Sequence, residues 1–150
     1  MSAYVRFGAM IATSTVAMLG LMYVNTYERD HLAFSETRVY MALVMGATMT
    51  IIMLAFMLRM HPDRRVNIAI FAGSAAVFAL ALWLVRSQVT IEDVSYMRAM
   101  IPHHSIAILT SERARIADPR VRALADKIID TQRAEIAEMR ALIGALERAR

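Results

Sequence analysis

Methionine and histidine side chains gather in one short stretch in the C-terminal third of the chain. Met97 and Met100 precede the adjacent pair His103 and His104, and Met139 follows in a second stretch. Thioether sulfur and imidazole nitrogen together form a ligand set that suits Cu(I). The chain has 13 methionines and no cysteine, which excludes disulfides, cysteine-based zinc sites and thiol catalysis. The residue types therefore indicate copper as the metal.

The spacing of these residues matters because it decides which of them share a helix face. Met97, Met100 and His104 are related by i, i+3 and i+7 and lie on one face. His103 lies about 100° around the helix, from where it serves the same site from its edge or the site of a neighbouring chain. Taken singly, each methionine is more often core filler, and each histidine a surface or capping residue. The joint pattern favours metal binding.

A second apolar pattern predicts a helix that packs against the first. Asp118 and Pro119 are typical of an N-cap and a first helical position. Apolar and polar seam residues then recur every 3.5 positions: Val121, Ala125, Ile128, Gln132, Glu135, Met139, Leu142 and Leu146. Because the turn between the two helices is short, they must run antiparallel, with the histidines opposite Gln132 and Glu135. Polar groups in a seam need partners, so we expect Gln132 to support the metal site and Glu135 to support it or to be a ligand.

The first of these two helices is expected to begin near Thr90–Asp93, with a hydroxyl cap, and to run to about Ile116. Pro102 lies inside it, removes one backbone hydrogen bond and predicts a kink just before His103. Alternatively, the helix proper begins at Pro102 and residues 91–101 form a separate short helix.

The N-terminal part of the chain is a predicted membrane anchor. The chain is 58% hydrophobic, which is high for a soluble domain of this size. Three uncharged runs, about 7–24, 39–58 and 66–85, are long enough to span a bilayer. The first run lacks the cleavage pattern of a signal peptide and is interpreted as a retained helix. We therefore predict an anchor over residues 1–88 and a helical domain over residues 89–150.

The distribution of charge predicts the orientation of this anchor. Arg59, Arg64 and Arg65 flank or lie in the short loop between the second and third runs, whereas acidic residues offset the arginines of the first loop. The positive-inside rule places the arginine-rich loop in the cytoplasm. The N-terminus is then cytoplasmic and residues 86–150 are extracytoplasmic. For a protein of the inner membrane of a Gram-negative bacterium, these residues lie in the periplasm. The sequence contains no basic stripe with interleaved aromatic residues, so we do not expect nucleic acid as a partner.

Two stretches of the C-terminal part resemble the DUF305 family. Residues 96–109 contain Met-Ile-Pro-His-His, and residues 118–139 contain Gln-x-x-Glu-Ile-x-x-Met. The resemblance covers about residues 89–143. It implies a ferritin-like helical fold and, because some members bind copper in the periplasm, a copper site. The ligands that it implies are Met100, His103, His104 and Met139, with Met97 as a further candidate.

The chain departs from this family pattern at two positions. Family members often carry glutamine and methionine where this chain has Ser105 and Leu109. The departure removes one thioether and argues against a high metal capacity.

Two further groupings carry weaker chemistry. A methionine at every fourth position of the second run predicts a packing ridge or, alternatively, a thioether ladder that carries Cu(I) across the bilayer: Met41, Met45, Met49, Met53 and Met57. Glu28 and His31 have the Glu-x-x-His spacing of di-iron helices, but a di-iron carboxylate site needs two such pairs and two more glutamates. We expect His31 to be a solvated loop residue, although the predicted topology would let it approach the C-terminal helices.

The sequence thus predicts an all-α protein: three transmembrane helices followed by an antiparallel two-helix, ferritin-like hairpin. The predicted function is copper binding for buffering, chaperoning or resistance, without an organic cofactor and without enzymatic activity. Expected partners are the lipid bilayer, envelope copper proteins and a second copy of the chain, because two helices bury little surface alone. Two alternatives stay open: an interaction module that dimerises through the seam, with its polar residues fixing register, and a copper transporter that uses the methionine ladder.

Overall fold

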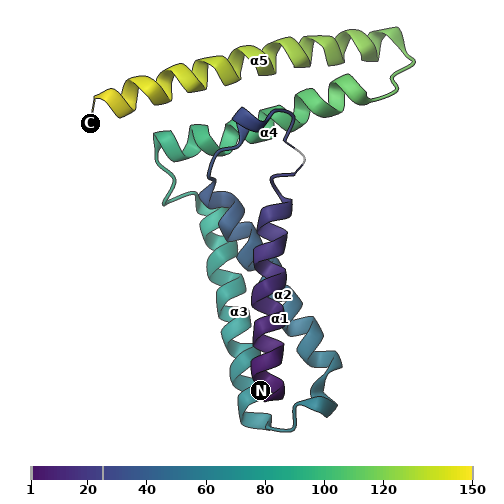
Figure 1. Cartoon of the computed structure of the whole chain (residues 1–150), viewed down its shortest axis with the longest axis vertical. Helices are drawn as coiled ribbons and strands as arrows, with labels where there is room; N and C mark the ends of the chain where they lie inside the picture. The colour runs from purple at the N-terminus through teal and green to yellow at the C-terminus, as the bar shows by residue number, and fades with distance from the viewer. Residues whose placement is uncertain (1, 25, 150) are drawn as a thin grey trace. The chain divides into compact units, whose positions relative to one another are not determined.

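The computed structural model describes residues 2–24 and 26–149, and its regular elements are helices throughout this part of the chain. The α-helices are α1 (Ala3–Leu21), α2 (Glu36–Phe56), α3 (Arg64–Ser87), α4 (Asp93–Arg113) and α5 (Pro119–Arg148), shown in Figure 1. Two short 3-10 turns, η1 (Arg29–His31) and η2 (Leu58–Met60), lie between them. The prediction of an all-helical protein is confirmed.

Contacts divide the chain into two compact units. One unit comprises Met1–Met22 and Thr37–Thr90, and the other comprises Tyr23–Glu36 and Ile91–Arg150. The sequence-based boundary at residue 88 had placed residues 23–36 with the anchor. We call this segment, residues 23–36, the α1–α2 connector.

The first unit contains α1, α2 and α3, and each of these helices is long and apolar enough to cross a membrane. The helix α3 starts cleanly because the Asp63 carboxylate accepts hydrogen bonds from the backbone N–H groups of Arg65 and Val66, at 2.9 and 3.1 Å. It ends at Gln88, which adopts the left-handed conformation with φ of 55°. Three helices of this kind are consistent with association with a membrane.

Helices α1 and α2 approach closely at one glycine. A Cβ atom built on Gly46 would lie 2.5 Å from Oγ1 of Thr15. Thr15 cannot easily turn away, because its hydroxyl donates to the carbonyl of Ile11 at 2.8 Å and its side chain is β-branched. The small size of Gly46 therefore permits this approach.

The methionine row of α2 runs beside the packed face of that helix. The buried residues of α2 are Ala42, Gly46, Ala47 and Leu54. Met41 and Met45 are each 39% exposed, and the remaining members of the row are half-buried. The row thus borders packed and exposed surface, as expected for adaptable side chains that fill an uneven boundary.

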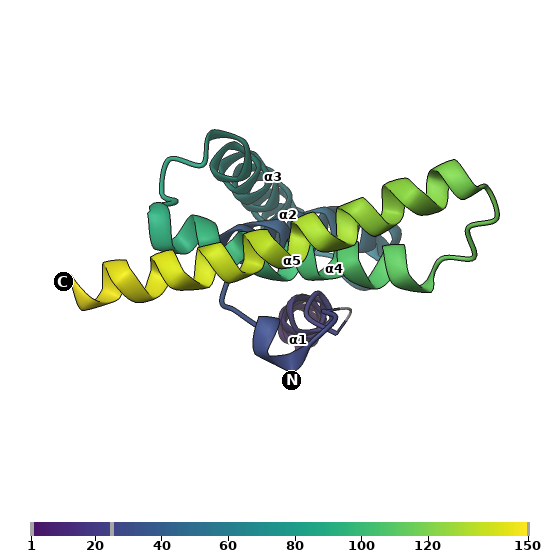
Figure 2. The same cartoon turned by 90° about the horizontal axis from the view of Figure 1, so that it is seen from above.

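In the second unit, α4 and α5 lie along each other in both views, as seen from above in Figure 2. Arg98 of α4 pairs with Glu147 of α5 at 2.6 Å, while Glu112 of α4 pairs with Arg133 of α5 at 2.5 Å. The two helices therefore run in opposite directions. Their shared core is formed by six buried apolar residues: Met97, Ile101, Ile108, Ile129, Ile136 and Met139.

The ends of these helices test the capping predictions. The carboxylate of Asp118 accepts the N–H of Arg120 at 2.8 Å and Pro119 is the first residue of α5, which confirms the predicted start. Helix α4 begins at Asp93 and not at Thr90, whose hydroxyl instead shares a hydrogen bond with that of Tyr40 at 2.9 Å.

Helix α4 also differs from prediction in its interior and at its end. It continues through Pro102, so the alternative of a separate short helix over residues 91–101 is wrong. It ends at Arg113, three residues before the predicted end at Ile116.

The predicted seam of α5 is only partly correct. Ala125 and Met139 are buried, but Ile128 is 37% exposed and Leu142 is 48% exposed. Ile129 and Ile136, which lie outside the predicted seam, take the buried positions. The physical reason is that α5 carries more apolar positions than α4 can cover, so the contact with α4 decides which of them are buried.

The close approach at Gly46 leads to a first prediction. Gly46→Ala should destabilise the first unit by about 1–3 kcal/mol, the usual range for overpacking, because the added methyl group displaces Thr15. The measurement is thermal unfolding in detergent micelles, and Thr15→Ala should restore stability to the Gly46→Ala chain. Gly73→Ala is the control, since a Cβ atom there meets nothing within 4 Å. Equal melting temperatures for Gly46→Ala and Gly73→Ala would contradict the prediction.

Candidate metal site

Helices α4 and α5 enclose an open pocket of about 570 Å³. Met97 and His104 reach it from α4, and Glu135 and Met139 reach it from α5. Both methionines are more than nine-tenths buried and belong to the apolar core shared by α4 and α5. The pocket thus joins two methionines and one imidazole with the carboxylate of Glu135, and Asp93 and Glu138 also line it.

The imidazole of His104 has an unsatisfied atom in this pocket. Its Nδ1 is buried and has no hydrogen-bond partner. The nearest acidic atom is Oε2 of Glu135 at 3.4 Å, which is longer than an ordinary N–H···O bond. Glu135 is itself held by Gln132, whose amide donates to the same oxygen at 3.1 Å. A buried polar atom of this kind calls for a partner, and a metal ion is one that the donor set fits.

Burial also sets the protonation of His104. It lowers the pKa of this imidazole below its ordinary value, since the cation would lose its hydration, and His103 lowers it further while Glu135 opposes the shift. The desolvation outweighs the attraction of Glu135, so the side chain is neutral at pH 7. Neutral imidazole is the form that binds metals.

Two of the predicted ligands do not line the pocket. Met100 is half-buried and packs against the apolar core. His103 is exposed, and its ring centroid lies 6.0 Å from that of His104. The structure therefore brings Met97, His104 and Met139 together with Glu135, places Gln132 behind Glu135, and leaves Met100 and His103 outside the pocket.

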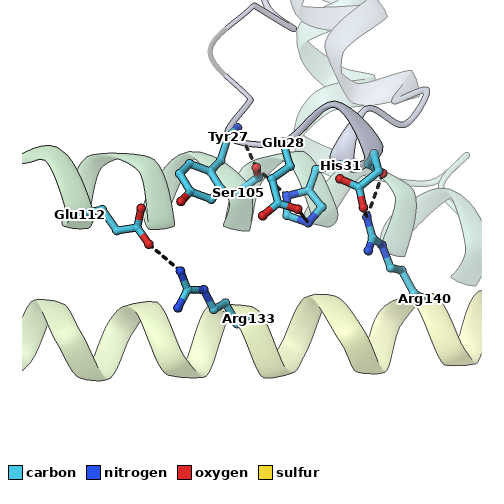
Figure 3. A network of polar contacts seen from close by, with 8 residues as sticks. Tyr27, Glu28, His31, Ser105, Glu112, Arg133 and Arg140 are labelled. Atoms are coloured by element: carbon cyan, nitrogen blue, oxygen red, sulfur yellow. Dashed lines mark hydrogen bonds and ion pairs between the residues drawn. The ribbon is translucent and has the colours of Figure 1, made fainter.

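The α1–α2 connector adds a set of polar contacts that the sequence analysis missed (Figure 3). His31 is only 6% exposed, so the expectation of a solvated loop histidine is wrong. Its Nδ1 lies 2.9 Å from Oγ of Ser105, which also accepts the backbone N–H of Tyr27 at 2.9 Å. Ser105, a departure from the family pattern, is therefore the docking point of the connector on α4. The serine at position 105, where family members often carry glutamine, was the sequence feature that could have indicated this contact.

One ion pair and one further side-chain hydrogen bond complete this docking. Arg140 of α5 donates to both the carboxylate and the carbonyl of Asp30, at 2.7 and 2.9 Å. The guanidinium holds the pKa of Asp30 below its usual value, so this carboxylate is ionised at neutral pH. A hydrogen bond to the Glu112 carboxylate raises the pKa of the Tyr27 phenol. The connector is thus held by both helices of the second unit.

Ser105, His31 and Glu28 lie in the order of a serine–histidine–acid relay, with Glu28 Oε2 3.5 Å from His31 Nε2. Ser105 has no exposed surface, and its oxygen already accepts a backbone hydrogen bond. A nucleophile must reach its substrate, so this arrangement serves docking.

Comparisons with known proteins agree with the resemblance noted from the motifs. The family model described as a domain of unknown function, DUF305, matches residues 91–150. An uncharacterized protein of Acanthamoeba polyphaga mimivirus is 34% identical over 142 residues, covering 90% of this chain and 91% of that protein. The chain belongs to the DUF305 family. The aligned region of the viral protein is longer than the DUF305 match, so the likeness extends into the apolar helices. No solved structure matches the chain.

The role of Ser105 in this DUF305 chain can be tested by removing its hydroxyl. Ser105→Ala should destabilise the second unit by about 1–3 kcal/mol, because it leaves the N–H of Tyr27 and Nδ1 of His31 without their partner. Ser111→Ala on the same helix is the control, since the contact of Ser111 with Arg122 uses the backbone carbonyl. Chemical unfolding followed by circular dichroism measures both. The docking interpretation fails if the two variants are equally stable.

Proposed function

We propose that this chain is a membrane-anchored copper-binding protein whose site is the pocket between α4 and α5. The observation that supports this best is the shared pocket of Met97, Met139 and His104, with a buried imidazole nitrogen that has no hydrogen-bond partner. Two thioethers and a neutral imidazole form a soft ligand set suited to Cu(I). Thioethers need no deprotonation, so such a site binds copper without competition from protons at sulfur.

Glu135 in the pocket and Gln132 behind it fit supporting roles. The charge of Glu135 favours a bound cation, and its hydrogen bond from Gln132 fixes the position of that charge. Residues of this kind tune metal affinity although they need not touch the ion. Within the proposal, the uses of such a site are copper buffering, chaperoning or resistance.

The proposed location follows from the three apolar helices and the arginine bias. Arg59 lies in η2, Arg64 and Arg65 begin α3, and all three are exposed. With these arginines in the cytoplasm, α4 and α5 lie on the outer side of a bacterial inner membrane. Free thiols are scarce competitors for copper there, which suits a thioether site.

A second candidate function is self-association of α5. Five apolar residues on this helix are more than one-third exposed: Val121, Leu124, Ile128, Leu142 and Leu146. A solvated helix normally exposes fewer large apolar side chains in one region, and a second copy of the chain would cover them. Leu142 and Leu146 also line the pocket between α4 and α5, so a second copy would cover part of its wall. Self-association itself requires no copper.

The ligand assignment can be tested residue by residue. Met97→Leu, Met139→Leu and His104→Ala should each weaken Cu(I) binding at least about tenfold, because each removes one donor from the pocket. Met100→Leu and His103→Ala should leave the Cu(I) affinity within about twofold of that of the parent chain, since neither residue lines the pocket. Anaerobic titration against a chromogenic Cu(I) chelator measures the affinities. The full chain is used because residues 23–36 pack with the second unit.

Met139→Leu is the sharpest of these variants, because leucine has a similar volume and keeps the core filled. Helical content and melting temperature should therefore stay near those of the parent. Copper affinity equal to that of the parent in both Met139→Leu and His104→Ala would refute the copper site.

Self-association has its own test. The parent chain without metal should sediment as a dimer in detergent micelles, and replacing Leu142 and Leu146 by Gln should shift it toward the monomer, since the exposed apolar area is lost. Asp130→Asn, which changes an exposed charged position on the same helix, serves as control. A parent that is monomeric at all concentrations would remove this candidate.

The orientation can be tested with fused reporters. A reporter that is active only outside the cytoplasm should be active after Arg150 and inactive when inserted in the loop at residues 61–63, because the positive-inside rule holds that loop in the cytoplasm. Replacing Arg59, Arg64 and Arg65 by Gln should weaken this bias. The opposite activity pattern would overturn the proposed location.

A further inference from the structure

The α1–α2 connector carries a group of metal-ligating side chains away from the copper pocket. One ligand atom each from Glu28, Asp30 and His31 lies within 4.8 Å of the others. His31 is buried, while the side chains of Glu28 and Asp30 are 52% and 61% exposed. Glu28 and His31 also line a small pocket of about 180 Å³ against α4 and α5. The imidazole of this group is therefore buried, and its two carboxylates are accessible to solvent.

Each end of this group is held in the way that metal ligands usually are. Ser105 contacts Nδ1 of His31 at 2.9 Å, which fixes the ring and leaves Nε2 directed to Glu28. The separation of Nε2 from the Glu28 oxygen is 3.5 Å, too long for a good hydrogen bond. Arg140 holds one carboxylate oxygen of Asp30 at 2.7 Å. Orienting partners on the far side of a histidine and of a carboxylate are typical of built metal sites.

We propose that Glu28, Asp30 and His31 form a second metal site, for a divalent ion of the zinc class. The donors are one imidazole nitrogen and two carboxylate oxygens, without sulfur, which suits Zn²⁺ and disfavours Cu(I). Metal–ligand distances near 2.0–2.2 Å place tetrahedral ligands roughly 3.5 Å apart. The two exposed carboxylates can close by rotation, whereas His31 stays in place. Water completes the coordination on the open side.

The competing explanation is that these residues only dock the connector. Docking is accounted for by the contacts of Ser105 with Tyr27 and His31 and by the contact of Asp30 with Arg140. Glu28 adds only its long contact with His31 to that docking, yet it supplies one of the three donors. Glu28→Gln therefore separates the two explanations: docking predicts no large effect, and a metal site predicts the loss of a ligand.

The test uses the full chain in detergent micelles after removal of metals with a chelator. Calorimetric titration with Zn²⁺ should give one site per chain, and Zn²⁺ should raise the melting temperature. Titration with Co²⁺ should give visible absorption bands of a four- or five-coordinate ion. Glu28→Gln should weaken Zn²⁺ binding at least tenfold and abolish the thermal shift, while its melting temperature without metal equals that of the parent.

Two controls make the result specific. Asp130→Asn removes an exposed carboxylate on α5 and should bind Zn²⁺ like the parent. His104→Ala removes the proposed copper ligand and should also keep full Zn²⁺ binding, so failure of the copper site leaves this site intact. The proposal is overturned if the parent binds no Zn²⁺, if Glu28→Gln binds it as the parent does, or if His104→Ala abolishes it.

Discussion

The packing of α4 against α5 is the contact on which the second unit depends. Each helix must remove one apolar face from water, and the pairing buries Ile101 and Ile108 against Ile129 and Ile136. The methionines at the end of this core, Met97 and Met139, are buried by the same contact. A metal site that uses them is therefore built into the core rather than added to the surface. This explains how two flexible thioethers from different helices can be held in one pocket.

The same packing decides which polar residues face the pocket. His104 is one turn beyond the buried Ile101 and points toward α5, whereas His103 is rotated by about 100° and remains in solvent. The imidazole that enters the pocket loses hydration, which lowers its pKa and leaves Nδ1 without a hydrogen-bond partner. Burial thus supplies both the neutral form and the unsatisfied atom that a metal would use.

The α1–α2 connector shows a different use of buried polarity. Ser105 is fully buried and would be costly without partners, but it receives the Tyr27 N–H and contacts His31. Tyr27 also packs against the apolar core of α4 and α5. The loop between two apolar helices is therefore part of the domain that carries the candidate site. A small residue at position 105 makes this possible, because a longer side chain would fill the space that His31 occupies.

Several features could be predicted from the sequence because they depend on local chemistry. Helix type, the three long apolar helices and the Asp118–Pro119 start follow from periodicity, hydropathy and capping, which act within a few residues. Position on one helix face also placed Met97 and His104 together, and the antiparallel turn placed Met139 opposite. Contacts between distant segments decided the rest. Only the packing could show which apolar row of α5 is buried, because both rows are apolar and α4 can cover one. Only the fold could bring Tyr27 and His31 to Ser105, over separations of 78 and 74 residues along the chain, because hydrogen bonds of this kind leave no periodic pattern in the sequence.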